Sequence, residues 1–262
     1  MGQPIAPNQG EKKMNVTAIV LAGGAGTRMG DACKEVPKSM LAFDDKPFLE
    51  YLVEWLIGAG IRDVVLSTGF LGEYIASHFG KDVWKKEGVR VVREEAPLGT
   101  GGAIRFVSTY ANQETLFLCN ADTVVEIDLP TTFQVSAMIQ KPMISVVTLN
   151  EGVPNQGAIK VESGIVTEFR EDGSIRPLTK NGGNFRASST GCYFAQKSLV
   201  LSEHFSYGSS LEKEILPRLV EDRLVGAVSS GTGIFFDFGV PERYAFLKQN
   251  TWILRKVYRA GL

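Results

Sequence analysis

Residues 16–30, VTAIVLAGGAGTRMG, join an apolar run of strand length to a loop with glycine at three of four positions, Gly23, Gly24 and Gly26. A buried strand that ends in glycines lets backbone N–H groups approach an anion, because no Cβ atom blocks the approach. The stretch therefore predicts a first strand over 16–22, followed by a phosphate-binding loop.

Two common phosphate-binding motifs do not match this loop. A Walker A loop needs Gly-Lys-Ser/Thr at a fixed spacing, and no such triplet follows. A dinucleotide fingerprint needs glycine or alanine where this chain has Met29, and it needs an amphipathic helix that does not begin there. A nicotinamide dehydrogenase is therefore disfavoured.

The chain on both sides of the loop shows the rhythm of an α/β protein. Apolar runs alternate with amphipathic stretches through the first half, which indicates βαβ units and a mostly parallel central sheet flanked by helices. After about residue 155 the runs are short, which indicates a small antiparallel addition. Expected strands are 63–67, 89–93, 115–119, 158–162, 165–170 and 188–194, with a final strand pair ending at Asp237. The first expected helix starts at Pro47, and four further helices are expected over 72–79, 101–110, 211–220 and 241–257.

Composition narrows the class of protein further. The 262 residues carry 28 Lys and Arg against 29 Asp and Glu, a net charge of −1, which disfavours a nucleic-acid-coating role. Hydrophobic residues make up 44% and charged residues 22%, so a folded core is expected. The longest apolar runs are far shorter than the ~20 residues that cross a bilayer, so no membrane partner is expected.

The first thirteen residues have no apolar core and no cleavage pattern, so they are expected to be a disordered extension with Met14 as an original start rather than a secretory signal. The three cysteines, Cys33, Cys119 and Cys192, form no Cys-x-x-Cys motif and are too few for a disulfide framework. Both observations favour the cytoplasm, with Cys119 and Cys192 as small core residues.

Two cations, Arg28 and Lys38, follow the glycine loop. A guanidinium makes forked contacts to phosphate and an ammonium is a compact charge, so the pair suits a polyphosphate leaving group. The strings LAGGAGTRMG (21–30), VPKSML (36–41) and KPFLEYLVEWLIGAGI (46–61) resemble the N-terminal signature of the sugar-1-phosphate nucleotidyltransferases. The resemblance implies a Rossmann-like α/β fold, a nucleoside triphosphate and a sugar 1-phosphate as substrates, Mg²⁺ as cofactor, and pyrophosphate as a product.

A second segment, EAPLGTGGA at 95–103, resembles the base-recognition segment of that family. Its Pro-Leu-Gly turn delivers glycines at a helix start, where backbone groups can read a base edge. The resemblance places the nucleotide on Leu21, Ala22, Gly23, Gly24, Gly26, Thr27, Arg28, Lys38, Glu95, Pro97, Gly99, Thr100, Gly101 and Asn120.

Two aspartates follow buried strands, where open α/β sheets bind ligands. Asp122 ends LFLCNAD (116–122), where the family usually has glycine in place of Ala121, and Asp237 lies in FFDFGVPE (235–242). Carboxylates suit a hard cation, and the resemblance makes both aspartates Mg²⁺ ligands. Arg28, Lys38, Asp122 and Asp237 are then the expected catalytic residues of an in-line attack by a sugar phosphate on the α-phosphorus. The two histidines, His78 and His204, have no catalytic partner in the sequence.

The expected sugar-binding residues come from three segments that resemble sugar-facing parts of the family. They are Gly157, Glu171, Ser189, Thr190, Glu212 and Lys213. The family commonly has lysine after the glutamate, where this chain has Asp172. We therefore expect Lys213 to replace the missing charge, against the alternative that residues 212–214 are the solvated start of a helix.

Within the family, the short chain and the segments PLGTGGAI, SLEKEILP and FDFGVPE most resemble guanylyltransferases for D-glycero-α-D-manno-heptose 1-phosphate, which serve surface polysaccharide synthesis. Mannose-1-phosphate guanylyltransferase, N-acetylmuramate-1-phosphate uridylyltransferase and glucose-1-phosphate thymidylyl- or uridylyltransferase stay open as alternatives, as does a non-catalytic nucleotide-binding module. Residues 14–150 are expected to bind the nucleotide and 151–262 the sugar. The family often forms dimers, so a homodimer is compatible with the resemblance.

Overall fold

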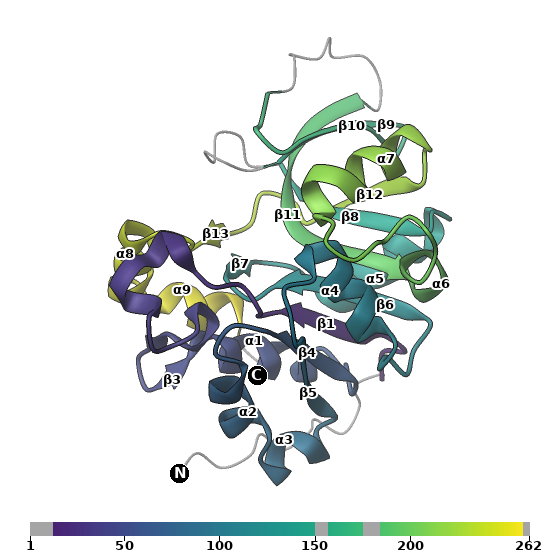
Figure 1. Cartoon of the computed structure of the whole chain (residues 1–262). Coiled ribbons are helices and arrows are strands. Elements are labelled where there is room, and N and C mark those ends of the chain that lie inside the picture. The colour runs from purple at the N-terminus through teal and green to yellow at the C-terminus, as the bar shows by residue number, and fades with distance from the viewer. Residues whose placement is uncertain (1–12, 150–156, 175–183, 259–262) are drawn as a thin grey trace.

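A nine-stranded sheet forms the centre of the computed structural model, which describes residues 13–149, 157–174 and 184–258 (Figure 1). All of its strands except β10 and β11 run in the same direction, so the expected mostly parallel sheet is confirmed. The order across the sheet is β5 (Val89–Arg93), β4 (Val64–Thr68), β1 (Thr17–Leu21), β6 (Thr115–Asn120), β11 (Asn184–Gln196), β8 (Met143–Thr148), β12 (Val225–Ser229), β10 (Ile165–Arg170) and β9 (Ala158–Glu162).

Helices cover both faces of the sheet, as expected. Neighbouring strand residues point to opposite faces, so Ala18 and Val20 pack into one apolar core and Ile19 into the other. The first core contains residues of α1 (Phe48–Gly58), α2 (Gly72–Phe79) and α9 (Trp252–Val257); the second contains residues of α4 (Gly99–Ser108), α6 (Lys197–Val200) and α7 (Leu216–Glu221). No helix in the described part of the chain is long and apolar enough to cross a membrane.

The strand β11 joins the two halves of the chain. It comes from the second half of the sequence, yet it lies between β6 and β8 of the first half and pairs antiparallel with both. It is also longer than the expected strand at 188–194, because its first residues continue past the parallel strands and pair with β9. As Figure 1 shows, β9, β10 and this end of β11 form the upper part of the molecule. The antiparallel addition is thus an extension of the central sheet.

Three expectations about the C-terminal half are wrong. The strands β12 and β13 (Phe235–Asp237) do not pair with each other, because β12 joins the central sheet and β13 pairs with β7 (Thr123–Val125). The helix expected over 241–257 is two helices, α8 (Pro241–Gln249) and α9, because Asn250 leaves the helical conformation. The helix expected over 211–220 begins with a wider π-turn, Leu211–Ile215, before α7.

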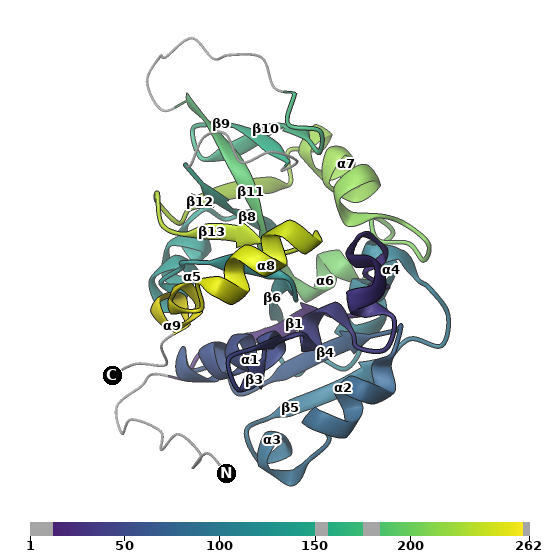
Figure 2. The same ribbon diagram turned by 90° about the vertical axis from the view of Figure 1, so that its left-hand side faces the viewer.

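One further expectation needs a correction near the N-terminus. Pro47 precedes α1 as its N-cap in an extended conformation and is not the first helical residue. Figure 2 shows α1 beside β3 (Lys46–Pro47). The cysteines Cys119 and Cys192 are buried in the core, as expected. Most of the predicted N-terminal extension lies outside the described residues.

The buried carboxylate of Asp63 connects several segments at the end of the sheet that lies away from the glycine loop. It accepts hydrogen bonds from the hydroxyl of Thr17, from Arg90, and from the backbone N–H and side-chain amide of Asn112, the last two at 2.9 and 3.1 Å. Substituting one member of a buried charged network leaves its partners without an acceptor. Asp63→Ala should therefore lower the free energy of unfolding by about 3 kcal/mol, measured by urea denaturation.

The control for this prediction is Asp82→Ala. Asp82 is exposed and approaches Lys85 at 3.9 Å on the surface of α3 (Asp82–Lys86), so its removal should change stability by less than about 0.5 kcal/mol. Equal effects of the two substitutions would contradict the structural role of Asp63.

Candidate active site

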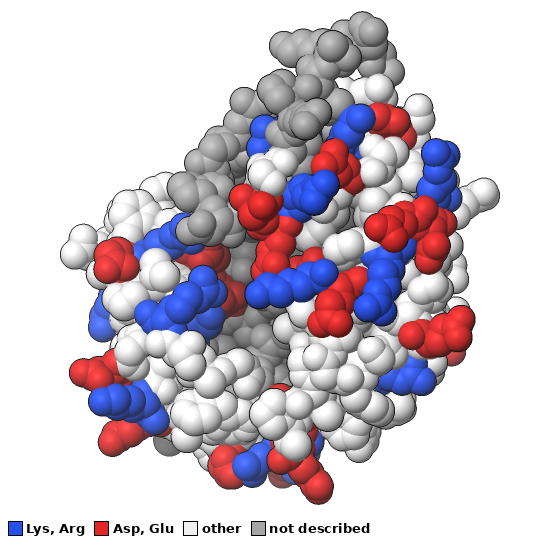
Figure 3. Space-filling model, turned by 45° about the horizontal axis from the view of Figure 1, so that its top comes forward, with Lys and Arg blue, Asp and Glu red and all other residues white. Residues whose placement is uncertain are grey.

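A cavity of about 720 Å³ opens at the carboxyl ends of β1, β4 and β6, a volume that suits a nucleotide. In parallel sheets this edge is where ligands bind. Figure 3 shows a hollow in the middle of one face of the molecule, with acidic and basic side chains on its rim. Twelve of the residues expected from the sequence line the cavity: Leu21, Ala22, Gly23, Gly24, Lys38, Glu95, Pro97, Gly99, Thr100, Asn120, Asp122 and Glu212.

The glycine loop forms one wall because its backbone runs close to a neighbouring loop. A Cβ atom on Gly23 would lie 3.0 Å from the backbone nitrogen of Gly69, and the carbonyl of Gly23 accepts a hydrogen bond from Phe70 N–H at 3.2 Å. Gly26 has φ +61 and precedes a 3₁₀ turn, Thr27–Cys33, so the loop bends away from the cavity there. Gly26, Thr27 and Arg28 accordingly do not line the cavity.

Two short strands bring the predicted aspartates together. In the β7–β13 pair Asp237 lies opposite Thr123, the residue after Asp122. The N–H of Phe238 also donates to the carbonyl of Asp122 at 3.1 Å. Residues 115 positions apart in the sequence therefore lie side by side, although Asp122 lines the cavity and Asp237 does not.

Each aspartate is paired with a cation. Lys38 Nζ contacts the Asp122 carboxylate, and Arg243 from α8 contacts the Asp237 carboxylate. The other oxygen of Asp237 accepts a hydrogen bond from Gly239 N–H at 3.1 Å. The guanidinium of Arg28 lies beside Gly239, since a Cβ there would be 3.5 Å from its Nη2. Three basic side chains thus surround the two carboxylates.

This arrangement fits a hard divalent cation that binds together with a substrate. The described residues contain no group of three or more His, Cys, Asp or Glu side chains that could hold a metal. The carboxylates of Asp122 and Asp237, on adjacent segments, offer only oxygen ligands. Mg²⁺ is commonly bound by one or two carboxylates, with the remaining ligands from phosphates and water. The two aspartates therefore suit a metal that arrives with a triphosphate.

The start of α4 is fixed against the segment that precedes α7. Gly99 has φ +68, and a Cβ there would lie 2.5 Å from the carbonyl oxygen of Ser209, so only glycine fits. Gly101 N–H donates to the same carbonyl at 2.9 Å. The hydroxyl of Thr100 accepts from Leu211 N–H at 2.7 Å. Gly101 therefore serves this contact and does not line the cavity.

The residues expected to bind the sugar are only partly brought to the cavity. Ser189 and Thr190 are buried; the Ser189 hydroxyl lies 3.0 Å from that of Tyr193, and the Thr190 hydroxyl donates to Val146 O at 2.7 Å. Lys213 is exposed at the π-turn and does not line the cavity. Its expected role as the sugar-phosphate cation therefore has no support from the geometry of the cavity.

Two further expected sugar-binding residues also lie off the cavity wall. Gly157 accepts a hydrogen bond from Ser189 N–H at 2.8 Å, and its neighbours Asn155 and Gln156 lie outside the described residues. Glu171 is exposed, but its charge reaches Glu212, which does line the cavity. Neither His78 nor His204 is among the cavity residues.

Glu212 is a cavity carboxylate whose surroundings disfavour its charged form. Burial raises its pKa above the ordinary value of 4.5, and the negative charges of Glu171 and Asp122 raise it further. The folded state therefore holds its proton more tightly than the unfolded chain, so ionisation of Glu212 costs stability as the pH rises above 4.5.

Glu212→Gln should accordingly raise the thermal unfolding midpoint at neutral pH by a few degrees. The gain over the natural protein should grow as the pH increases through the carboxyl range, which scanning calorimetry at several pH values would measure. Glu221→Gln, at the exposed end of α7, is the matched control. A lower midpoint for Glu212→Gln at neutral pH would contradict this reading of the carboxylate.

Several cavity residues were missed from the sequence: Ala25, Ser39, Ser67, Gly69, Phe70, Arg93, Glu94, Ala96, Ala103 and Ala121. Gly69 and Glu94 directly follow β4 and β5. Their position after the carboxyl ends of predicted strands was a signal that could have identified them. Arg243 was also missed, because only the pairing of β7 with β13 brings α8 to the aspartates.

Comparison with known proteins agrees with this geometry. The model of the family described as nucleotidyl transferase matches residues 17–250. The chain is 32% identical over 234 residues to the D-glycero-α-D-manno-heptose 1-phosphate guanylyltransferase of Aneurinibacillus thermoaerophilus, covering 87% of this chain and 94% of that protein. It is 30% identical over 228 residues to the enzyme of the same name from Campylobacter jejuni, covering 87% and 96%.

A solved structure gives the same picture. The crystal structure of HddC from Yersinia pseudotuberculosis complexed with GMP-PN superposes with a TM-score of 0.71 at 26% identity, covering 90% of this chain and 99% of that chain.

Proposed function

The chain belongs to the nucleotidyl transferase family, and from this premise we propose that it transfers a guanylyl group from GTP to D-glycero-α-D-manno-heptose 1-phosphate. The products are GDP-heptose and pyrophosphate, and the nucleotide sugar serves surface polysaccharide synthesis. The proposal rests foremost on the two relatives of that name, each at least 30% identical and covering 87% of this chain.

The cavity supports transfer to a phosphate because a lysine and an aspartate line it beside the glycine loop. Lys38 and Asp122 line the cavity together with Gly23 and Gly24 of the glycine loop, whose backbone N–H groups would bind phosphate oxygens. Arg28 and Arg243 lie beside Asp237. Three cations close to a triphosphate site reduce the negative charge that repels an attacking phosphate oxygen.

In the proposed reaction, the chain's own residues position the substrates and neutralise their negative charge. The backbone of Gly23 and Gly24 holds the triphosphate, and Lys38 donates to a nonbridging oxygen as charge moves toward the leaving pyrophosphate. Arg28 lies off the cavity wall beside Asp237, and its positive charge adds to this neutralisation from there. Glu212, which lines the cavity, would accept hydrogen bonds from hydroxyl groups of the sugar. A sugar phosphate oxygen then attacks the α-phosphorus, and the bond to pyrophosphate breaks.

Asp122 and Asp237 would hold the divalent cation, which we propose to be Mg²⁺. When bound, the cation supplies Lewis-acid stabilisation of phosphoryl oxygens. In its absence, Lys38 and Arg243 neutralise the two carboxylates. Binding of the triphosphate gives Lys38 a second anionic partner, which releases Asp122 for the cation.

The proposal extends to the organisation of the chain. Residues 14–150 form the nucleotide-binding part and residues 151–262 the sugar-binding part, even though both contribute strands to one sheet. A homodimer and a place in the cytoplasm complete the proposal.

Pyrophosphate release with a grid of substrates tests the proposed function. GTP, UTP, dTTP and CTP would each be combined with the 1-phosphates of heptose, mannose, glucose and N-acetylmuramate in the presence of Mg²⁺. The highest kcat/KM is expected for GTP with heptose 1-phosphate. A higher value for mannose 1-phosphate, or for a pyrimidine nucleotide with another sugar, would replace the proposal by the corresponding alternative. Absence of release with every pair would refute it.

A further inference from the structure

The ribbon formed by β7 and β13 carries the two proposed cation ligands at one end, and it pairs with no other strand in the described part of the chain. Asp122 directly precedes β7, and Asp237 is the last residue of β13. A two-stranded ribbon is marginally stable by itself. The positions of the two carboxylates therefore depend on the contacts that the ribbon makes with the rest of the molecule.

Tyr258, which directly follows α9, contacts the outer edge of β7. The N–H of Phe238 donates to the carbonyl of Asp122, so the backbone of Asp122 faces β13 and that of the next residue, Thr123, faces the opposite edge. There the carbonyl of Thr123 accepts a hydrogen bond from the phenol of Tyr258 at 2.9 Å. The phenol thus takes the place that the N–H group of a further strand would have.

The ring of Tyr258 is held in the core. Tyr258 is 5% exposed, and its ring packs against Phe48 and Trp55 of α1 at centroid distances of 5.8 and 5.6 Å. Nearby on α9, Lys256 contacts the carboxylate of Glu126, the residue after β7, at 3.4 Å. Contacts from α1 and α9 therefore fix the phenol against β7.

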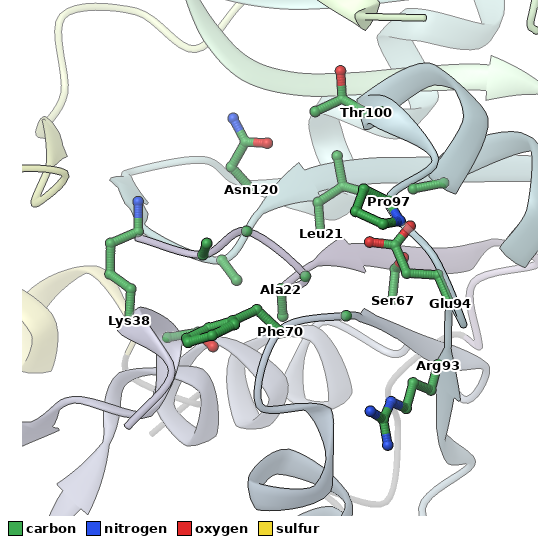
Figure 4. Close-up of a pocket in the computed structure, with 18 of the residues that line it drawn as sticks. Leu21, Ala22, Lys38, Ser67, Phe70, Arg93, Glu94, Pro97, Thr100 and Asn120 are labelled. Atoms are coloured by element: carbon green, nitrogen blue, oxygen red, sulfur yellow. The ribbon is translucent and has the colours of Figure 1, made fainter. Parts of the chain in front are cut away.

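The side chain of Thr123 connects this edge of β7 to the carboxylate of Asp122. Its hydroxyl donates to Asp122 Oδ1 at 3.2 Å, while Lys38 Nζ donates to Asp122 Oδ2. Figure 4 shows the ammonium group of Lys38 on the same side of the cavity as Asn120, the last residue of β6. Lys38 lines the cavity and Thr123 does not, so Oδ2 is the oxygen on the cavity side.

We propose that Thr123 and Tyr258 are positioning residues for the cation site, acting through the carboxylate of Asp122. The phenol of Tyr258 fixes the backbone of Thr123, and the hydroxyl of Thr123 retains Oδ1. When a triphosphate draws Lys38 away, Oδ2 is then presented to the cation while Oδ1 stays bound. This inference rests on the proposed function, because it assumes that Asp122 holds the divalent cation.

The test measures Mn²⁺ binding by calorimetry in the presence of a nonhydrolysable GTP analogue. Thr123→Val removes the hydroxyl and keeps the β-branched shape of the side chain. It should weaken Mn²⁺ binding by about 10-fold, as the loss of a hydrogen bond to a metal ligand typically does. Thr123→Ser restores the hydroxyl and should bind Mn²⁺ within about threefold of the natural protein. Tyr258→Phe keeps the ring, loses the phenol, and should weaken binding by about 3- to 10-fold.

Steady-state kinetics give a second readout, which separates positioning from a loss of folded protein. Figure 4 shows Lys38 on one side of the cavity and Pro97, of the expected base-recognition segment, on the other. Thr123→Val should therefore leave KM for GTP within about twofold of the natural value, while kcat at limiting Mg²⁺ falls by about 10-fold. Excess Mg²⁺ should restore part of this loss. A variant that is only less stable would regain nothing.

Two matched controls carry the same kinds of hydrogen bond away from the cation site. The buried phenol of Tyr51 donates to Phe43 O at 3.2 Å, and the hydroxyl of Thr131 donates to the carboxylate of Asp128 at 2.8 Å. Tyr51→Phe and Thr131→Val should leave Mn²⁺ binding and kcat within about twofold of the natural values.

The Asp122→Asn background shows whether Thr123 acts through Asp122. Residues that act through one group have effects that do not add. Thr123→Val should therefore cause no further loss of Mn²⁺ binding or of kcat in Asp122→Asn. A loss of the same size in both backgrounds would contradict the positioning role.

Mn²⁺ binding within about twofold of the natural value in folded Thr123→Val and Tyr258→Phe would overturn the inference. Equal losses in Tyr51→Phe and Tyr258→Phe would overturn the role of Tyr258. Failure of the proposed function looks different: pyrophosphate release with another pair of substrates would change the substrates and leave the Mn²⁺ result standing. If the natural protein bound no Mn²⁺ with the nucleotide analogue, the proposed cation site and this inference would both be wrong.

Discussion

Asp122→Asn should lower kcat for pyrophosphate release by at least about 10³-fold. The substitution keeps the size of the side chain but removes its charge, so it weakens the proposed cation site and leaves Lys38 without its anionic partner. The loss should appear in kcat more than in KM for GTP, because the glycine loop and the base end of the cavity are unchanged. Steady-state kinetics with heptose 1-phosphate, and calorimetric titration of Mn²⁺ with a nonhydrolysable GTP analogue, would measure both effects.

The control for this substitution is Asp82→Asn. Asp82 and Lys85 form an exposed pair on α3 at 3.9 Å, which is the surface counterpart of the Lys38–Asp122 pair. Asp82→Asn should leave kcat within about twofold of the natural value, since surface pairs of this kind contribute little. If Asp122→Asn retained more than a tenth of the natural kcat with correct folding, Asp122 would not be a catalytic residue.

Lys38→Met should lower kcat/KM for GTP by about 10²- to 10³-fold. Methionine retains much of the apolar stem of lysine and loses the ammonium, so the substitution removes the charge that faces the departing pyrophosphate. Because the carboxylate of Asp122 then loses its cation, this variant should also bind free Mn²⁺ more tightly than the natural protein does. Pyrophosphate release and Mn²⁺ titration in the absence of nucleotide would check the two expectations.

The two substitutions act on one contact, so their effects should not add. The double variant Asp122→Asn/Lys38→Met should lose much less activity than the product of the single losses, as coupled groups in an active site do. Lys85→Met is the matched control for the lysine. Full additivity of the two losses would mean that Lys38 and Asp122 act independently, against the contact seen between them.

Much of the fold could be predicted because its signals are local. Strand β1 and its glycine loop are contiguous in the sequence, and the apolar periodicity of α1 follows within thirty residues. The course of β11 could not be predicted in the same way. Its position between β6 and β8 depends on packing between segments that are far apart in the chain, which no local pattern records.

The residues of the candidate site could likewise be predicted only where a local signal places them. Residues that closely follow a strand, such as Asp122, Gly23 and Gly24, reach the cavity as expected. Ser189 and Thr190 were expected beside the sugar because of their motif, but both lie in β11, where their hydroxyls turn to internal partners. Glu94 was missed because its position gains meaning only when β4 and β5 bring it over Gly69.

The net charge of the chain does not reveal the local arrangement of charged side chains, which only the structure shows. A net charge of −1 conceals a cluster in which Arg28, Lys38 and Arg243 surround two aspartates. The alternative of a non-catalytic nucleotide-binding module gives no reason for so many paired charges at the end of a nucleotide-sized cavity. Membership in a nucleotidyltransferase family gives a reason for these paired charges.

Phosphorus NMR of one reaction mixture would follow the transfer of a guanylyl group from GTP to a heptose 1-phosphate. The mixture contains the full chain, GTP, D-glycero-α-D-manno-heptose 1-phosphate and Mg²⁺. The signals of both substrates should decline together while GDP-heptose and pyrophosphate appear in equal amounts, and Asp122→Asn should produce neither. Unchanged substrates, or GTP converted to GDP and inorganic phosphate without a nucleotide sugar, would contradict it.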